Sequence, residues 1–272
     1  MTRCLSTSGT AAGVAFDSIA EQYDDIFTRS LIGRAQRDAV WEVLRQTFRA
    51  GQQVLELNCG TGEDALFLSR MGVAVVACDA SEKMIAVAAR RMASEPRGAQ
   101  LRLEVRATEQ IGLTAVAPYD GVLSNFSGLN CVSDLAAVGR MLGRMVKPGG
   151  CVVVCMSSRF CLWEWLWFSA HGQATRAMRR WKGSTTAYLG NMALEVRYPT
   201  VREIRQSFAS HFRLRRFKGI GVAVPPTYLE HLARRLPALL RGLEAVDHVV
   251  SSRRIFRVIG DHILLVFERT AA

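Results

Sequence analysis

The sequence predicts an α/β protein built on a mostly parallel, doubly wound sheet, and two observations lead to this fold class. From residue 14 to residue 156, short apolar runs bounded by turn residues alternate with helical segments. Short buried strands joined by helices are typical of a parallel sheet with right-handed crossovers. The chain has 272 residues and is 49% hydrophobic, which suffices for a large core and excludes a disordered protein.

The expected elements follow from the spacing of apolar residues. A spacing of three to four residues predicts helices, and short continuous apolar runs predict buried strands. Helices are expected over residues 14–29, 35–48, 64–71, 82–92 and 134–146. Strands are expected over residues 53–57, 73–78, 101–105, 121–124 and 151–156.

The last third of the chain has a different pattern. Residues 160–180 and 201–210 read as helices, and residues 212–217 and 263–268 read as strands. No linker rich in Gly, Ser or Pro divides the sequence. We therefore expect a disordered tail over residues 1–12 and a single domain over residues 13–272, with residues 158–200 and 222–258 as insertions that form a cap.

Composition narrows the cellular setting. The seven cysteines are an odd number without a Cys-x-x-Cys pair, which disfavours a disulfide framework or a metal site and indicates a reducing cytoplasm. No apolar run reaches the roughly 18 residues of a spanning helix, and the first ten residues lack the apolar segment of a signal peptide. The formal net charge of +11 leaves nucleic acid, an anionic membrane surface or an arginine-rich proteome as explanations.

A glycine-rich turn between an expected strand and helix is the sharpest local signal. Gly60 and Gly62 can adopt positive φ and let a ligand approach the backbone, and Asn58 is the side-chain-bearing type that best tolerates the left-handed region. The pattern Gly60-x-Gly62-x-x-Ala65 by itself also matches the dinucleotide fingerprint. The turn therefore predicts a ligand site without naming the ligand.

Charge separates the two classes of ligand. Glu56 would set a carboxylate beside the pyrophosphate of a dinucleotide, and Glu63 and Asp64 add negative charge at the helix start. A ligand with an ammonium and a sulfonium group is favoured by the same carboxylates. These residues point to S-adenosylmethionine as the cofactor, with S-adenosylhomocysteine as its product.

An acidic residue ends the second expected strand. Asp79 stands where doubly wound folds that bind adenosine place an acid on the ribose hydroxyls. The alternative is a solvated loop acid or a helix cap. Thr108 and Glu109, in the loop after the third strand, would border the adenine.

Several segments, taken in order, resemble the class I S-adenosylmethionine-dependent methyltransferases that act on small molecules. The resemblance runs from about residue 16 to residue 156, a little over half of the chain. The matching segments are Ala15-Phe16-Asp17-x-x-Ala20-x-x-Tyr23-Asp24, Glu56-Leu57-Asn58-Cys59-Gly60-Thr61-Gly62, Cys78-Asp79-Ala80-Ser81-x-x-Met84, Tyr119-Asp120-Gly121-Val122-Leu123-Ser124-Asn125-Phe126 and Val146-Lys147-Pro148-Gly149-Gly150.

The resemblance implies a seven-stranded Rossmann-like sheet whose last strand is antiparallel, completed by residues 212–217 and 263–268, with a helical cap insertion. It implies cofactor contacts from Tyr23, Glu56, Asn58, Cys59, Gly60, Gly62, Asp79, Ala80, Met84, Thr108, Glu109 and Asn125. Two positions depart from the family pattern. Asn58 replaces the usual first glycine, and Ala107 stands where the family often has an Asp near the adenine amine.

Candidate catalytic and acceptor residues lie near the expected carboxyl edge of the sheet. Asn125 follows the fourth strand, where ligands bind in such folds, and His262 enters the last strand. Both are candidates for a catalytic role. Aromatic candidates for the acceptor pocket are Trp163, Trp167, Tyr198 and Tyr228; the alternative for the two tryptophans, which share a helical face, is core packing.

We therefore expect an enzyme that moves a methyl group by in-line displacement to a small, apolar or aromatic acceptor, such as a natural product or a lipid-like molecule. The alternatives are an RNA methyltransferase, which the absence of nucleic-acid methylation signatures disfavours, and a non-catalytic S-adenosylmethionine-binding protein. A nicotinamide oxidoreductase fits least. Basic residues just after the tryptophans, Arg176, Arg179, Arg180 and Lys182, leave peripheral membrane contact open.

Overall fold

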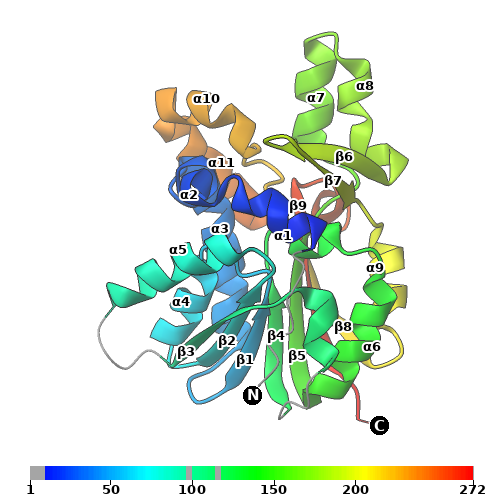
Figure 1. The fold of residues 1–272 in the computed structure, drawn as a ribbon. Coiled ribbons are helices and arrows are strands. Elements are labelled where there is room, and N and C mark those ends of the chain that lie inside the picture. The colour runs from blue at the N-terminus through cyan, green and yellow to red at the C-terminus, as the bar shows by residue number, and fades with distance from the viewer. Residues whose placement is uncertain (1–9, 96–99, 114–117, 272) are drawn as a thin grey trace.

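A seven-stranded sheet forms the centre of the computed structural model, which describes residues 10–95, 100–113 and 118–271 (Figure 1). The strand order is β3-β2-β1-β4-β5-β9-β8, and only β9 runs against its neighbours. The strands are β1 (Gln53–Leu57), β2 (Ala74–Asp79), β3 (Leu101–Val105), β4 (Tyr119–Ser124), β5 (Val146–Ser157), β8 (Phe212–Ile220) and β9 (His262–Arg269). The predicted fold class and the antiparallel last strand are confirmed.

Helices cover both faces of this sheet, and successive strand residues alternate between the two layers. Val54 packs with Val40, Leu44 and Phe48 in one cluster, and Leu55 packs in the other. The first layer contains α3 (Leu31–Thr47), α4 (Glu63–Arg70) and α5 (Glu82–Ala93), and the second contains α6 (Leu135–Met145) and α9 (Val201–Phe208). The two clusters hold the sheet between the helical layers and so fix the positions of the strand ends.

The amino-terminal segment differs from the expected single helix over residues 14–29. It folds as α1 (Ala11–Asp17), α2 (Ala20–Tyr23) and a π-helical turn (Asp24–Thr28). The break occurs because Ile19 leaves the helical conformation, with φ −118° and ψ 0°, while the Ser18 hydroxyl donates to the Ala15 carbonyl at 2.7 Å. The prediction of one continuous helix is wrong here.

The expected tail over residues 1–12 is described only from residue 10 onward. Residues 1–9 lie outside the described part of the chain. The Thr10 hydroxyl accepts from the Gly13 backbone N–H at 3.1 Å and caps α1, which starts at Ala11. The described part of the chain therefore begins inside the range expected to be a tail.

The first insertion contains a β-hairpin in addition to the expected helices. It holds α7 (Leu162–Ala170), α8 (Ala174–Ala177) and a 3₁₀ turn (Arg179–Lys182), followed by the antiparallel strands β6 (Ser184–Leu189) and β7 (Met192–Arg197). Gly190, with φ +56°, makes the tight turn between the two strands.

The second insertion contains a pair of helices, α10 (Glu230–Arg235) and α11 (Pro237–Val250). Further 3₁₀ turns cover Thr108–Leu113, Gly128–Cys131, Thr227–Leu229 and Phe256–Val258. Within the described ranges, no helix combines the length and the apolar character that crossing a bilayer requires.

Candidate active site

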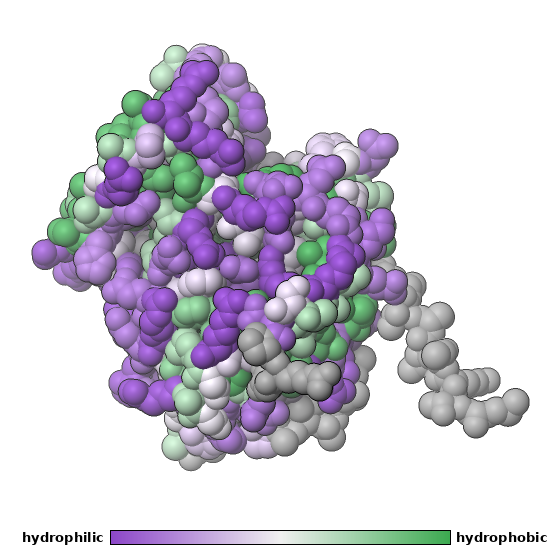
Figure 2. Space-filling view, turned by 90° about the vertical axis from the view of Figure 1, so that its left-hand side faces the viewer, coloured by the Kyte–Doolittle hydropathy of each residue, from purple (hydrophilic) through white to green (hydrophobic). Residues whose placement is uncertain are grey.

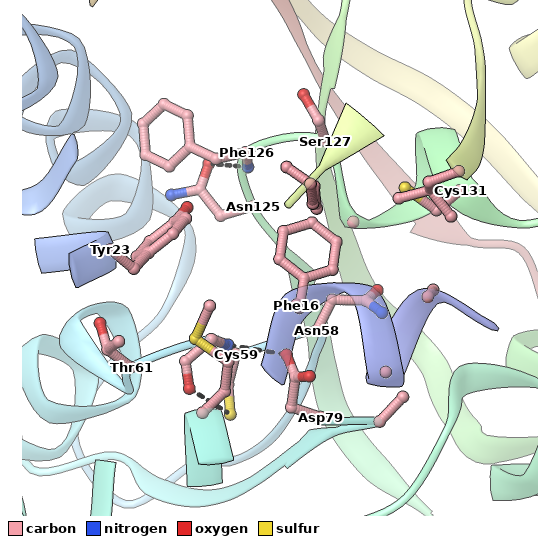
Figure 3. Close-up of a pocket in the computed structure, with 18 of the residues that line it drawn as sticks. Phe16, Tyr23, Asn58, Cys59, Thr61, Asp79, Asn125, Phe126, Ser127 and Cys131 are labelled. Atoms are coloured by element: carbon pink, nitrogen blue, oxygen red, sulfur yellow. Dashed lines mark hydrogen bonds between the residues drawn. The ribbon is translucent and has the colours of Figure 1, made fainter. Parts of the chain in front are cut away.

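A pocket opens at the carboxyl ends of β1, β2 and β4, under the amino-terminal helices and the β6–β7 hairpin (Figure 3). It contains about 1000 Å³ of space, part of which is open solvent. Its lining comprises Ala12, Gly13, Phe16, Tyr23, Arg37, Asn58, Cys59, Gly60, Thr61, Glu63, Asp64, Asp79, Ala80, Met84, Asn125, Phe126, Ser127, Gly128, Cys131, Ala187, Leu189, Leu194 and Val196.

The glycine-rich turn forms the floor of the pocket. Asn58, Gly60 and Gly62 have φ of +55°, +54° and +75°, so the predicted left-handed conformations are confirmed. A Cβ built on Gly60 would meet no atom within 4 Å, which leaves the backbone open to a ligand. A Cβ on Gly62 would lie 2.9 Å from Ala88, so this glycine allows α4 and α5 to pack closely.

Asn58 ties the turn to the loops after β3 and β4. Its Oδ1 accepts from the Thr108 and Ser124 hydroxyls, each at 3.3 Å. Gly128 lies so close that a Cβ there would overlap the Asn58 side chain. Three loops that are far apart in sequence therefore meet at one residue, which fixes the floor of the pocket.

Asp79 lines the pocket at the end of β2 and is held by backbone groups. Its Oδ2 accepts from the Gly60 N–H at 2.9 Å and its Oδ1 from the Ser81 N–H at 2.8 Å. Burial raises the pKa of the Asp79 carboxyl, although these N–H groups act in the opposite direction. The helix cap of α5 is Ser81 and not Asp79, which leaves the remaining lone pairs of Asp79 available to a ligand.

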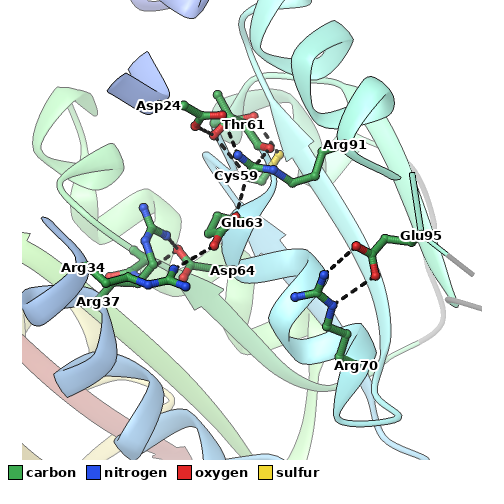
Figure 4. Close-up of polar contacts among 12 residues, drawn as sticks. Asp24, Arg34, Arg37, Cys59, Thr61, Glu63, Asp64, Arg70, Arg91 and Glu95 are labelled. Carbon is green, nitrogen blue, oxygen red and sulfur yellow. Dashed lines mark hydrogen bonds and ion pairs between the residues drawn. The ribbon is translucent and has the colours of Figure 1, made fainter. Parts of the chain in front are cut away.

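The amino-terminal helices are fixed to these loops by carboxylates. Asp24 accepts from the Thr61 hydroxyl at 2.7 Å and pairs with Arg91 at 2.5 Å (Figure 4). Asp17 accepts from the Ser81 hydroxyl at 2.6 Å. These contacts place Tyr23 against the pocket, where burial raises the pKa of its hydroxyl to about 12.

A buried arginine, which sequence reasoning missed, forms part of the wall. Arg37 on α3 pairs with Asp64 at 2.5 Å, and its guanidinium lies 4.9 Å from the Phe126 ring centre. Asp64 also accepts from Trp41 Nε1 at 2.6 Å and from Asn125 Nδ2 at 3.0 Å. Among the described residues, Arg37 Nε has no hydrogen-bond partner.

The roof of the pocket is apolar. Ala187 and Leu189 of β6 and Leu194 and Val196 of β7 face the turn across the cavity. An adjoining depression shares Asn58 with the pocket and extends to Thr108 and Glu109. The structure therefore brings both predicted adenine-side residues to the same cleft.

Comparisons with known proteins agree with this geometry. Residues 54–150 match the sequence model of a methyltransferase domain. A demethylmenaquinone methyltransferase of Clavibacter sepedonicus is 31% identical over 157 residues, which cover 56% of this chain and 60% of the relative. Its counterpart in Streptomyces avermitilis is 34% identical over 143 residues, covering 52% and 57%. Residues 54–150 therefore form a methyltransferase domain.

Solved structures support the fold of this methyltransferase. The 4+2 cyclase SpnF superposes with a TM-score of 0.66 at 16% identity, covering 96% of each chain. The CcbJ methyltransferase of Streptomyces caelestis gives a TM-score of 0.61 at 17% identity, covering 94% of this chain and 98% of the other. The chain spans only about 60% of the length of the curated relatives named above.

Two buried side chains near the turn have unpaired polar atoms. Buried Glu56, directly before the turn, has a carboxylate oxygen without a hydrogen-bond partner in the described part of the chain, and burial raises its pKa well above the usual value. Glu56 does not line the pocket, whereas Arg37 does, and its Nε is an unpaired donor there. The carboxylate of the amino-acid group of S-adenosylmethionine needs such a donor.

Most of the expected cofactor residues meet in this cleft, and two do not line it. Ten of the twelve line the pocket or the adjoining depression. Glu56 and Gly62 are absent from the described lining, because Glu56 lies behind the turn and Gly62 packs against α5. Arg37 and the hairpin residues were not foreseen; Arg37 had a signal, since it is a charged residue at an apolar position of an amphipathic helix.

The four aromatic residues predicted for the acceptor are placed elsewhere. Trp163 and Trp167 pack with Ile32 and Leu240 in a third cluster, and Trp163 Nε1 donates to the Ala223 carbonyl at 2.9 Å. This position favours the core-packing alternative for the tryptophans. Tyr198 lies under Arg180, and Tyr228 lies beside Phe168; neither belongs to the described lining.

The two predicted catalytic residues are differently placed. Asn125 lines the pocket, but its amide is engaged by Asp64 and by the Phe126 N–H. His262 packs edge-on against Phe126, with 5.4 Å between ring centres, and so lies one side chain away from the pocket. Its Nδ1 is 3.5 Å from Asp261 Oδ2, and burial lowers its pKa.

Proposed function

We propose that this chain transfers a methyl group from S-adenosylmethionine to a small, apolar, ring-bearing acceptor. One observation carries the proposal. A single pocket has a polar floor, with Asp79 and the open backbone at Gly60, and an apolar roof that includes Leu189 and Leu194. The floor suits the donor, and the roof suits an apolar acceptor.

The donor would be held by residues of three elements. Asp79 would accept from the ribose hydroxyls, and Arg37 would meet the carboxylate of the donor. Ala80 and Met84 would flank the adenine. When bound, this cofactor supplies a methyl group that its sulfonium already activates, so the protein's task is alignment and the exclusion of water.

The described carboxylates of the pocket are all occupied by partners. Asp64 is paired with Arg37, and Glu63 with Arg34 and Arg91, at 3.0 Å for both Glu63 pairs. Asp79 accepts from two backbone N–H groups. Alignment can lower a barrier by roughly 7–11 kcal/mol in favourable cases. Because none of these described carboxylates is free to act as a base, the acceptor is one that is nucleophilic without a protein base. The acceptor loses its proton to water after the new bond to the methyl carbon has formed.

A quinol-like ring is the acceptor class that we favour. Electron-rich ring carbons and ionised ring hydroxyls are nucleophilic without a protein base. The relatives named above are called demethylmenaquinone methyltransferases, which supports a quinone-derived acceptor. We place the reaction in the reducing cytoplasm, as the cysteine pattern indicates.

The donor assignment is tested by calorimetric titration with S-adenosylhomocysteine. Asp79→Asn should weaken binding at least about tenfold, because one charge-assisted hydrogen bond to the ribose is worth roughly 1.5–3 kcal/mol. Asp120→Asn is the matched control, since Asp120 accepts from the Gln53 N–H at 2.8 Å at the opposite edge of the sheet. Equal affinity in the wild type and Asp79→Asn would remove the ribose assignment.

The acceptor is tested with isotopically labelled donor and three substrate classes: demethylated naphthoquinols, simple catechols and structured RNA. We expect label in the quinol or catechol fraction. Label in RNA, with affinity that falls steeply with salt, would favour the RNA alternative that the charge of +11 raises. Donor binding without transfer to any class or to a cell extract would favour a non-catalytic binding protein.

A further inference from the structure

The tip of the cap, defined here as residues 160–182, carries an apolar surface that the fold does not need. The opposite side of α7 is already used, because Trp163 and Trp167 pack in the third cluster and Phe168 is buried. Five large apolar side chains remain at least 42% exposed. They are Phe160, Trp165, Leu166, Met178 and Trp181.

This apolar surface is pre-formed and projects away from the body of the molecule. Phe160 and Trp181 are locked edge to face, with 5.6 Å between ring centres. In Figure 1, α7 and α8 rise above every other element, on the side where β1, β2 and β4 end. Figure 2 shows hydrophobic and hydrophilic residues side by side on the upper lobe. Five large exposed apolar side chains within one short segment are typical of an interaction site.

The exposed charge of the cap tip is positive. Residues 160–182 contain four basic residues and one acidic residue, Glu164. Glu164 is 1% exposed and is neutralised by Arg179 and Arg180. Arg176 and Lys182 are exposed and, among the described residues, pair with no carboxylate. Exposed apolar groups are thus accompanied by uncompensated positive charge.

The neighbouring helix pair extends the same character. The third cluster joins α7 to α10 and α11 through contacts of its tryptophans with Leu229, Ala233 and Leu240. Next to these contacts, Leu236 and Leu239 are more than half exposed, and Arg235 is exposed beside them. The apolar and cationic surface therefore covers parts of both insertions.

We propose that the cap tip binds an anionic phospholipid surface, with Trp165, Leu166 and Trp181 in the interface and the basic residues on the headgroups. Tryptophan combines an apolar ring with a polar N–H and prefers this boundary. Lysine and arginine beside it are attracted by the negative surface potential of such membranes. The nine residues of α7 are too few to span a bilayer, so the tip lies in the headgroup region.

This membrane contact is independent of methyl transfer and can be measured without donor or acceptor. It would place the pocket next to a bilayer in which apolar acceptors dissolve. A second copy of the chain or an RNA would be the other occupants of such a surface. Aromatic rings such as Trp165 and Trp181 would also stack on RNA bases, whereas aliphatic side chains such as Leu166 and Met178 suit an apolar phase only.

The test is co-sedimentation of the full chain with vesicles, either of phosphatidylcholine alone or of equal parts phosphatidylcholine and phosphatidylglycerol. We expect binding to the anionic vesicles that is at least tenfold tighter and that weakens with salt. Trp165→Ser with Leu166→Ser should weaken this binding at least tenfold. Val105→Ser, at a residue of similar exposure on the edge strand β3, is the matched apolar control and should bind as the wild type does.

The role of the basic residues is tested with two double variants, each of which removes two positive charges. Arg176→Gln with Lys182→Gln should abolish the preference for phosphatidylglycerol. Arg102→Gln with Arg144→Gln removes two exposed charges at the amino-terminal edge of the sheet and should keep that preference. An equal effect of both pairs would show that only overall charge matters, and would overturn the proposed site.

Depth is tested by quenching of tryptophan fluorescence with bromine-labelled phospholipids. Quenching should be strong in the wild type and weaker in Trp165→Phe, which keeps the apolar ring and removes the fluorophore. Three outcomes overturn the proposal: no association with anionic vesicles at low salt, association that the Trp165 and Leu166 substitutions leave unchanged, or a dimer in sedimentation velocity that these substitutions dissociate. Unchanged affinity for S-adenosylhomocysteine shows that each variant is folded.

Discussion

Single residues of the glycine-rich turn have separable tasks. Asn58 joins three loops through one amide oxygen, Gly60 leaves its backbone open to the pocket, and Gly62 lets α4 and α5 pack closely. All three have positive φ. Their roles differ because different atoms surround each residue, and the sequence alone does not show which atoms these are.

The two glycines provide a matched pair of substitutions. Gly60→Ala should lower the free energy of unfolding by about 1–2 kcal/mol because of its left-handed backbone, and should weaken S-adenosylhomocysteine binding because the methyl group enters the pocket. Gly62→Ala should destabilise the fold at least as much through its contact with Ala88, yet leave the affinity of folded protein within about threefold. Calorimetry and urea unfolding check both; the reverse order of affinities would contradict the assignment.

His262 should make stability depend on pH. Burial lowers its pKa below the usual 6.5, against the attraction of Asp261 and together with the repulsion of Arg180. A histidine with a lowered folded-state pKa stabilises the protein fully above pH 6.5, and this stability is lost as the pH falls further, by at most about 1.4 kcal/mol per pH unit. Urea unfolding between pH 7.5 and about 5 should show a steeper decline for the wild type than for His262→Gln. Parallel curves would show that His262 is not the titrating group.

The sequence predicted the residues of the pocket floor better than those of the pocket wall. Backbone requirements are local, so Asn58 and Gly60 could be recognised from their types and their place after a strand. Arg37 stands at an apolar position of an amphipathic helix, which indicates burial, but its partner in α4 and its neighbouring rings are set by helix packing. Glu56 was expected to face the ligand directly, but the pleat of β1 buries it behind the turn.

Among the elements, the cap is fixed to the body of the protein by buried charges. Arg180 pairs with Glu164 of α7 and, at 2.8 Å, with Asp261 before β9. Burial alone would raise the pKa of the Asp261 carboxyl, but His262 and Arg180 outweigh it and hold that pKa below its usual value. Gln36 of α3 donates to the same carboxylate at 3.3 Å. One arginine therefore connects two distant parts of the chain.

Removal of that arginine should loosen the cap. Arg180→Met leaves Glu164 and Asp261 buried without their shared cation and should cost about 3–5 kcal/mol of unfolding free energy. Arg179→Met removes a pair to the same Glu164 from a side chain that is 37% exposed, and should cost less than about 1 kcal/mol. Chemical denaturation measures both values. Similar costs for the two variants would mean that the cap is held by apolar packing.

The β6–β7 hairpin should decide acceptor binding more than donor binding. Leu194 is buried in the pocket roof, and Leu194→Ala would open space there. We expect a KM for a quinol acceptor that is raised several-fold, with S-adenosylhomocysteine affinity within about twofold of the wild type. Tyr188→Ala, at an exposed residue of the same hairpin, is the control. A loss confined to donor affinity would place the acceptor elsewhere.

The sheet could be predicted from the sequence and the hairpin could not, for a physical reason. Buried parallel strands are often continuous apolar runs, such as residues 151–156, which are stable when they pair with other strands of the same sheet. The strand Ser184–Leu189 is half exposed and polar, so its pattern resembles a loop. Its one local signal is the Gly190-Asn191 pair, which is typical of a two-residue hairpin turn.

At the scale of the whole molecule, the functional surfaces gather at one edge of the sheet. The loops after β1, β2 and β4 form the floor of the pocket, the amino-terminal helices and the hairpin close it, and the cap tip projects beyond it (Figure 1). This arrangement follows from parallel strands, whose carboxyl ends all point in one direction.

The pocket therefore couples the stability of the entire chain to its ligand. Because the amino-terminal helices, the sheet and the first insertion all line it, a ligand that binds only the folded state should stabilise all of them together. At a hundredfold excess over Kd, the gain is about 2.7 kcal/mol, or roughly 5–10 °C in Tm for a chain of this size. Differential scanning fluorimetry with S-adenosylhomocysteine should show one transition that moves upward by this amount. NAD should leave it in place, since the Asp79 carboxylate beside the turn, which pairs with no cation among the described residues, disfavours a pyrophosphate there. A shift with NAD alone, or two transitions of which only one moves, would contradict the shared pocket and the charge argument for its donor.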